Sequence, residues 1–158
     1  MILPLLAAIA VIALRLVLHT IERPVEGTGF MLVHFLALVT VVFFAGARLL
    51  RQDRHTPIAM LLRTGFRSAA VYAVAMAVFL YAYFTWYDPS YFQQRIDHLV
   101  WRGVSEGQPE AIIRPRMEQF FTPFNYATIT LATLLLSGGI LTVIAAVFQH
   151  KVLRRLRR

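Results

Sequence analysis

Four long apolar blocks are the feature that most constrains the fold of this chain. They lie at residues 2–18, 29–47, 68–87 and 126–148. Each holds about 17 to 23 residues, enough at about 1.5 Å per residue to cross a hydrocarbon core roughly 30 Å thick. Because lipid offers the backbone no hydrogen-bond partners, each block must be a helix. The sequence therefore predicts an all-α membrane protein, a single domain over residues 1–158 with four transmembrane helices.

The first block is also expected to stay in the protein rather than serve as a signal peptide. No basic region precedes its apolar run, and no small-residue cleavage pattern follows it.

Charged residues divide unequally between the two sides that four spans define. One side holds both ends of the chain and the 48–67 connection, with ten basic residues against the single acid Asp53. The other side carries five basic residues and seven acids. The basic side should face the cytoplasm, which places both termini inside. The ten basic residues are Arg48, Arg51, Arg54, Arg63, Arg67, Lys151, Arg154, Arg155, Arg157 and Arg158.

The formal net charge of +8 has two interpretations, and the sequence favours membrane lipid over nucleic acid. The basic cytoplasmic tail at 149–158 follows a span directly, where it should rest on anionic headgroups. Nucleic-acid binding is not expected, because no aromatic interleaving or binding motif accompanies the charge.

The connection at residues 88–123 is predicted to hold two amphipathic helices on the outer side. Asp88 is the expected N-cap of the first helix and Gly103 its stop, while Pro115 should kink or shorten the second. Such helices lie in the interface plane or cap the bundle, and a lid over a ligand is the alternative. On the inner side, residues 56–66 are predicted to form a short helix leading into the third span.

Small residues on two spans are predicted to pack helix against helix. A residue without a large side chain lets two backbones approach closely in lipid. On the third span these residues recur at every fourth position, and on the fourth span two hydroxyl residues share a face ahead of a glycine pair. The expected packing residues are Gly65, Ala69, Ala73, Ala77, Thr133 and Ser137.

Two ionisable residues lie inside the predicted spans, and such residues are functional candidates by default. Arg15 and His34 should occupy one layer near the outer interface, with Asp88 and Arg102 able to close over it. One hypothesis is a pocket for an anionic headgroup in which Arg15 binds phosphate or carboxylate. The alternative is that Arg15 reaches the interface or pairs with Glu22 or Asp88, and that His34 makes an interhelical hydrogen bond.

No metal, cofactor or catalytic residue is expected. The chain has five histidines but no cysteine, and no histidine pair has the spacing of metal ligands on one helix. A glycine-rich phosphate loop, a Gly-x-Ser-x-Gly motif and a carboxylate pair within the spans are likewise missing from the sequence.

The order of these features resembles a known family. The third span runs into YDPSYF at 87–92, GVSEGQPEAI follows at 103–112, and the last span contains LSGGILTVIAAVF at 136–148 before a basic end. This order is similar to that of the bacterial membrane proteins grouped as domain of unknown function 4199, and the similarity is best over 63–155. The resemblance implies four spans and a location in the bacterial cytoplasmic (inner) membrane. It implies no catalytic residue.

Two functions from different classes follow. The first is a non-catalytic protein that acts by helix–helix association, as a scaffold or regulatory subunit of a membrane enzyme or as a homo-oligomer. The resemblance suggests a membrane glycosyltransferase as one candidate partner. The alternative is a small lipid- or anion-binding protein or carrier with its headgroup site in the outer leaflet. The two functions predict different effects of Arg15→Lys. Association tolerates a lysine at this position, whereas recognition of a headgroup by a planar guanidinium does not.

Overall fold

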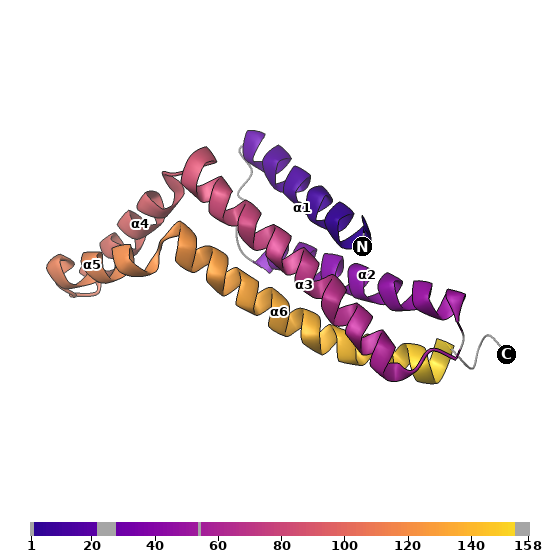
Figure 1. The fold of residues 1–158 in the computed structure, drawn as a ribbon. Coiled ribbons are helices and arrows are strands. Elements are labelled where there is room, and N and C mark those ends of the chain that lie inside the picture. Colours follow the sequence, from indigo (N-terminus) through magenta and orange to yellow (C-terminus); the bar gives the residue numbers. More distant parts are fainter. Residues whose placement is uncertain (1, 22–27, 54, 154–158) are drawn as a thin grey trace. The chain divides into compact units, whose positions relative to one another are not determined.

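The structure is a computed structural model that describes residues 2–21, 28–53 and 55–153, and every regular element in these ranges is helical (Figure 1). In chain order the elements are α1 (Ile2–Thr20), α2 (Thr28–Gln52), α3 (Ile58–Ala82), the π-helical turn η1 (Tyr83–Tyr87), α4 (Tyr91–Ser105), α5 (Glu110–Phe120), α6 (Pro123–Phe148) and the π-helical turn η2 (Gln149–Leu153).

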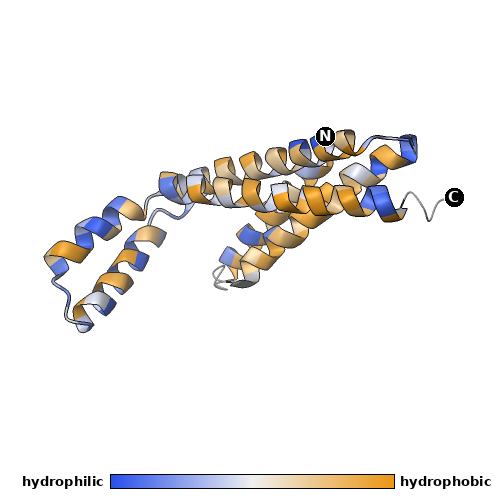
Figure 2. Ribbon diagram, turned by 90° about the horizontal axis from the view of Figure 1, so that it is seen from below, coloured by the Kyte–Doolittle hydropathy of each residue, from blue (hydrophilic) through white to orange (hydrophobic). Residues whose placement is uncertain are grey.

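Four of the described helices are long and apolar enough to cross a membrane, which confirms the predicted all-α class with four spans. Figure 2 shows their hydrophobic colouring along most of their length, whereas α4 and α5 mix both colours. Three of the predicted blocks lie inside one of the four stretches, and the second begins one residue before its stretch, so the predicted spans were mostly too short rather than misplaced. The stretches run Ile2–Thr20, Phe30–Gln52, Ile58–Tyr87 and Pro123–Val152.

The third helix begins earlier than the predicted span. The short helix expected at 56–66 is the first part of α3 itself, which starts at Ile58 and continues into the span without interruption. Pro57 precedes its first residue, a position where the missing N–H costs nothing. Gly65 breaks the pattern of apolar side chains, but the helix continues through it. A Cβ on Gly65 would lie 2.6 Å from Cγ2 of Thr142, so the glycine is used for packing rather than for a break.

The described residues form two compact units, one within 1–76 and 132–158 and the other within 77–131. In the first unit, α3 and α6 approach each other most closely at small residues. A Cβ on Gly138 of α6 would lie 2.7 Å from the Cβ of Ala69 on α3 and 3.4 Å from Cδ2 of Leu38 on α2. Three helices therefore meet at Gly138, where there is no room for a side chain.

The predicted packing residues differ in where they lie. Ala69, Ala73 and Ala77 are all buried on α3. On α6, however, Thr133 is exposed and does not pack within the chain, and Ser137 is only half-buried. The contact runs instead through Gly138 and Thr142, the next small residues along the helix. The prediction chose the wrong face of α6 because that helix is apolar all round and offers no pattern to orient it.

A buried glutamine fixes the other end of α6 to α2. Nε2 of Gln149 donates a hydrogen bond of 2.7 Å to the backbone carbonyl of Phe43, and the glutamine side chain is fully enclosed. Gly46 leaves the space for it, since a Cβ there would collide with the Gln149 carboxamide. The amide of a buried glutamine is thus satisfied by the neighbouring helix rather than left unpaired in lipid.

The second unit contains a helical hairpin made by α4 and α5 (residues 91–120). Its small core consists of Ile96 and Val100 from α4 and Ile113 from α5. Gly103 was expected to end α4, and this prediction is wrong because the helix continues to Ser105. Gly103 instead makes room for Ile113. A Cβ added at position 103 would lie 2.6 Å from Cδ1 of Ile113. The turn is made by Gly107, with φ of 87°.

Two further boundaries of the hairpin differ from expectation. The first helix begins at Tyr91 with Ser90 in the capping position, so Asp88 is not its N-cap. Pro115 lies inside α5, which nevertheless continues to Phe120. Since Pro115 is only six residues into α5, the carbonyl that loses its hydrogen bond is close to the first turn.

The glycine pair on α6 provides a matched test of the α3–α6 contact. We expect Gly138→Ala to lower the free energy of unfolding by about 1 to 2 kcal/mol, because its Cβ meets the short, unyielding Ala69. Gly139→Ala should be neutral or stabilise by about 0.5 kcal/mol, because alanine favours helix and its Cβ meets only Cε1 of Phe66, 3.2 Å away on a ring that can turn. The measurement is unfolding in mixed detergent micelles followed by circular dichroism. Equal effects of the two substitutions would contradict this packing.

Candidate functional site

Arg15 lies on the buried face of α1, not on the face that meets lipid. The buried residues of this helix are Pro4, Ala8, Val11 and Arg15, spaced four, three and four apart. This spacing defines one face of a helix. The arginine side chain is only 4% exposed. A charge at this depth needs a polar or aromatic environment inside the protein.

Arg15 and His34 both contact the same phenylalanine. Cζ of Arg15 lies 5.3 Å from the centre of the Phe30 ring, within the range of a cation–π interaction. The Phe30 ring meets the His34 ring edge-on, with centroids 5.0 Å apart. Arg15 and His34 were the predicted pair, whereas Phe30 was missed because an apolar residue in an apolar span gives no signal.

His34 also connects α2 to α3. Its Nδ1 lies 2.8 Å from the hydroxyl of Tyr72, which is fully buried on α3 next to Ala73. One of the two groups donates the hydrogen bond and the other accepts it, depending on the histidine tautomer. This contact is of the interhelical kind that the alternative interpretation expected for His34.

Asp88 and Arg102 belong to the second unit, where their contacts are local. The Asp88 carboxylate accepts a hydrogen bond of 3.2 Å from the Ser90 hydroxyl. Nε of Arg102 lies 3.0 Å from Oε1 of Glu106, one turn further along α4, and both side chains are exposed. An exposed pair of this kind contributes little to stability.

The central charge of the hairpin is Arg114. Its guanidinium donates to Asp97 on α4 at 2.8 Å and to Glu110 on its own helix at 2.9 Å. These two hydrogen bonds raise the pKa of Arg114 above its ordinary value, so it stays charged at every pH of interest. The network connects α4 to α5 along the side of the hairpin core.

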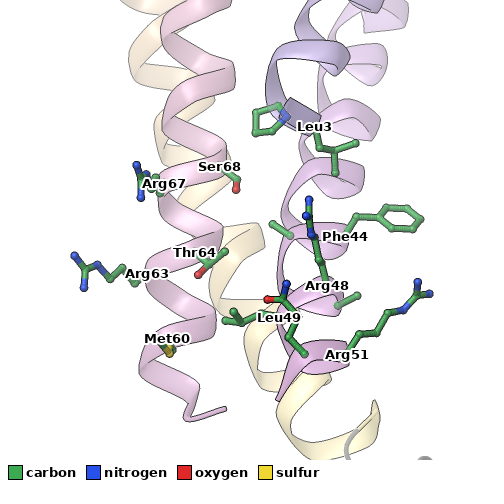
Figure 3. Close-up of a pocket in the computed structure, with 14 residues that line it drawn as sticks. Leu3, Phe44, Arg48, Leu49, Arg51, Met60, Arg63, Thr64, Arg67 and Ser68 are labelled. Atoms are coloured by element: carbon green, nitrogen blue, oxygen red, sulfur yellow. The ribbon is translucent and has the colours of Figure 1, made fainter. Parts of the chain in front are cut away.

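A second candidate site lies between α1, α2 and α3, and sequence analysis did not find it. This arginine cleft has a volume of about 830 Å³, and its walls include Arg48 and Arg51 of α2 and Arg63 and Arg67 of α3. Figure 3 shows Thr64 and Ser68 pointing from α3 toward α2, while Arg63 and Arg67 extend away from α2. In the sequence, these arginines indicate only which side of the membrane they face. The feature that could have predicted the cleft is the short connection 53–57, whose five residues bring the two charged helix ends together.

Metal binding has no support in the described part of the chain. No group of three or more histidine, cysteine, aspartate or glutamate side chains lies close enough there to hold an ion.

These features define a multi-pass helical membrane protein in which two buried polar side chains, His34 and Gln149, bond from one helix to another. The chain belongs to the family described as Protein of unknown function (DUF4199), whose model matches residues 3–151. No curated protein and no solved structure matches the chain.

The His34–Tyr72 contact can be measured by a double-mutant cycle. Tyr72→Phe, His34→Leu and the double variant should give a coupling energy of about 0.6 kcal/mol, the usual value for a hydrogen bond between membrane helices. Tyr81→Phe is the matched control, because Tyr81 lies on the same helix and is exposed. We expect that control to leave the unfolding curve unchanged. A coupling energy of zero between His34 and Tyr72 would mean that the contact does not hold the helices.

Proposed function

We propose that this chain is a non-catalytic protein of the bacterial cytoplasmic membrane that acts by association with another membrane protein or with further copies of itself. The observation that carries the proposal is the set of exposed apolar side chains on the α4–α5 hairpin. Trp101 and Phe120 are 69% and 54% exposed, and Val104 and Ile112 on the same two helices are exposed as well. Large apolar side chains outside the spans must be covered by a membrane surface or by a partner.

The charges of the hairpin support a partner as the cover. Residues 91–120 contain four basic and four acidic side chains, so their formal charges cancel. Arg114 pairs with Asp97 and Glu110, and Arg102 pairs with Glu106. An interfacial amphipathic helix usually presents unpaired basic residues to anionic headgroups. A hairpin with self-compensated charge and exposed aromatic residues is closer in composition to a protein interface.

The buried polar groups of the spans support a structural role as well. His34 is bonded to Tyr72 and Gln149 to the Phe43 carbonyl, each across two helices, whereas the Thr142 hydroxyl donates to the carbonyl of Gly138 on its own helix. The first two contacts hold helices together, and the third is satisfied within α6. A scaffold or regulatory subunit of a membrane enzyme, such as a glycosyltransferase, fits this arrangement, and so does a homo-oligomer.

The proposed orientation places both termini in the cytoplasm and the hairpin outside. Its support is the gathering of positive charge at one end of the first unit, where α2 ends and α3 begins. Arg48, Arg51, Arg63 and Arg67 all lie there, within a few residues of Asp53 as the sole acid.

A second candidate function is the binding of an anionic headgroup in the outer leaflet by Arg15 and His34. The observation that favours it is the burial of Arg15 beside His34 on the Phe30 ring. A planar guanidinium used for binding is not replaceable by lysine, whereas a purely structural cation is. Loss of a bound lipid in Arg15→Lys would select this function over association.

Association predicts a complex that depends on the hairpin. Native mass spectrometry of the chain released directly from bilayer discs should show either a multiple of its 18.0 kDa mass or a second polypeptide at fixed stoichiometry. The double variant Trp101→Ser and Phe120→Ser should lose that complex. The matched control is Gln93→Ser with Gln119→Ser, two exposed polar positions of the same helices. A wild-type chain released as a single copy without a second polypeptide would refute association.

The orientation can be tested with single cysteines, because the chain contains none of its own. Ser105→Cys, exposed in the hairpin, should react with a membrane-impermeant maleimide on intact spheroplasts. Gln52→Cys, exposed at the end of α2, should react only after the membrane is permeabilised. The opposite pattern of labelling would reverse the proposed orientation.

A further inference from the structure

The arginine cleft has a chemistry that neither association nor the outer-leaflet site uses. Its lining includes four arginines and no acidic residue. In the part of the chain that the structure describes, Arg48, Arg51, Arg63 and Arg67 make no ion pair or hydrogen bond with one another or with other residues. Four positive charges around one cavity repel one another, so an anion in the cavity would be attracted by all of them.

The polar groups of the cleft are suited to phosphate. Figure 3 shows Arg48 extending along α2, while Thr64 and Ser68 point toward α2 from α3. A guanidinium can bind phosphate with two parallel hydrogen bonds, and hydroxyl groups can donate to the remaining oxygens. Arg63 and Arg67 are four residues apart and share one side of α3, where they add positive charge at the edge of the cleft.

The remaining wall of the cleft is apolar, which a soluble anion would not need. Leu3 and Pro4 from the start of α1 and Phe44 from α2 line it together with the arginines. All three belong to stretches long and apolar enough to cross a membrane, and the four arginines lie in the parts of the α2 and α3 stretches nearest to the connection between these helices. The lining therefore offers charged groups for a headgroup and an apolar wall for acyl chains.

We propose that the arginine cleft binds the phosphate headgroup of an anionic phospholipid, with Arg48, Thr64 and Ser68 as its direct contacts and acyl chains against Leu3, Pro4 and Phe44. Arg51, Arg63 and Arg67 supply the positive field at the edge. Basic pockets between transmembrane helices on the cytoplasmic side bind lipids with phosphate headgroups. The assignment to the inner leaflet rests on the proposed orientation, but the chemistry of the cleft does not.

Positive charge on the cytoplasmic side also determines topology. Lipid binding and the determination of topology depend on the arginines in different ways. Topology depends on the number of lysines and arginines near the spans. A lipid site depends on which arginine is replaced. Lys151 in η2 is exposed, belongs to the same side and does not line the cleft, so it is the matched control for Arg48.

The test is a titration of the purified, delipidated full chain in neutral detergent with cardiolipin, which carries two phosphates, observed by native mass spectrometry. The wild type should bind one cardiolipin per chain and show no comparable binding of phosphatidylcholine. Arg48→Gln should weaken cardiolipin binding about tenfold or more, as expected for a lost charge-assisted contact. Lys151→Gln should bind like the wild type, and Thr64→Val with Ser68→Ala should bind more weakly than the wild type. Unfolding curves establish that each variant is folded.

Three outcomes would overturn the proposal. Equal weakening by Arg48→Gln and Lys151→Gln would show diffuse attraction to the basic side. Displacement of cardiolipin by an equal concentration of inorganic diphosphate would assign the cleft to a soluble phosphate compound. Failure of the wild type to bind cardiolipin would leave the arginines as topology determinants alone. None of these results depends on a protein partner, so the proposed association stands or falls separately.

Discussion

The close contact between α3 and α6 is the constraint on which the first unit depends. Apolar side chains gain little by leaving lipid for a protein interior, so membrane helices are held by tight packing and by hydrogen bonds between them. Gly65 and Ala69 on α3 meet Thr142 and Gly138 on α6 with no space for a further carbon atom. This contact fixes the rotation of α3 about its axis. Tyr72 must then face α2, where its hydroxyl reaches His34.

The buried arginine shows how a costly group is accommodated in the same bundle. Arg15 extends the buried face of α1 by one turn, so its direction follows from the packing of Ala8 and Val11. Its guanidinium then lies over the ring of Phe30, which offers a negative π-face. The bundle around α1 thus determines the environment of the charge. The fold therefore holds the Arg15 side chain in one position. Both a binding residue and a structural cation need such a fixed position.

The sequence predicted the number and approximate position of the spans because hydrophobic length is a property of single segments. It failed where the outcome depends on a neighbouring helix. Gly103 has the composition of a helix stop, yet it lies within α4 because Ile113 of α5 occupies the space beside it. Thr133 has the composition of a packing residue, yet Gly138 and Thr142 make the contact. Glycine and threonine have both roles in membrane helices, and only the facing residue decides between them.

The candidate site illustrates the same limit. Arg15 and His34 could be singled out because charges and histidines are rare in lipid. The arginine cleft could not be predicted from the number of basic residues on one side, because that number does not say which arginines lie close together. In the structure, the turn from α2 to α3 is closed by the Asp53 carbonyl, which accepts hydrogen bonds from the N–H and hydroxyl of Thr56.

In the proposed orientation, the short turn between α2 and α3 connects the charges that determine orientation with the proposed lipid site. The positive-inside rule favours basic residues at both helix ends that flank a cytoplasmic connection. When that connection has only five residues, the two sets of charges must converge, whatever selected them. Their mutual repulsion disfavours the close turn unless anions gather there, and in the proposed orientation the headgroups of the inner leaflet would supply them. In this chain the cleft that the arginines line also has apolar residues from the start of α1 in its wall.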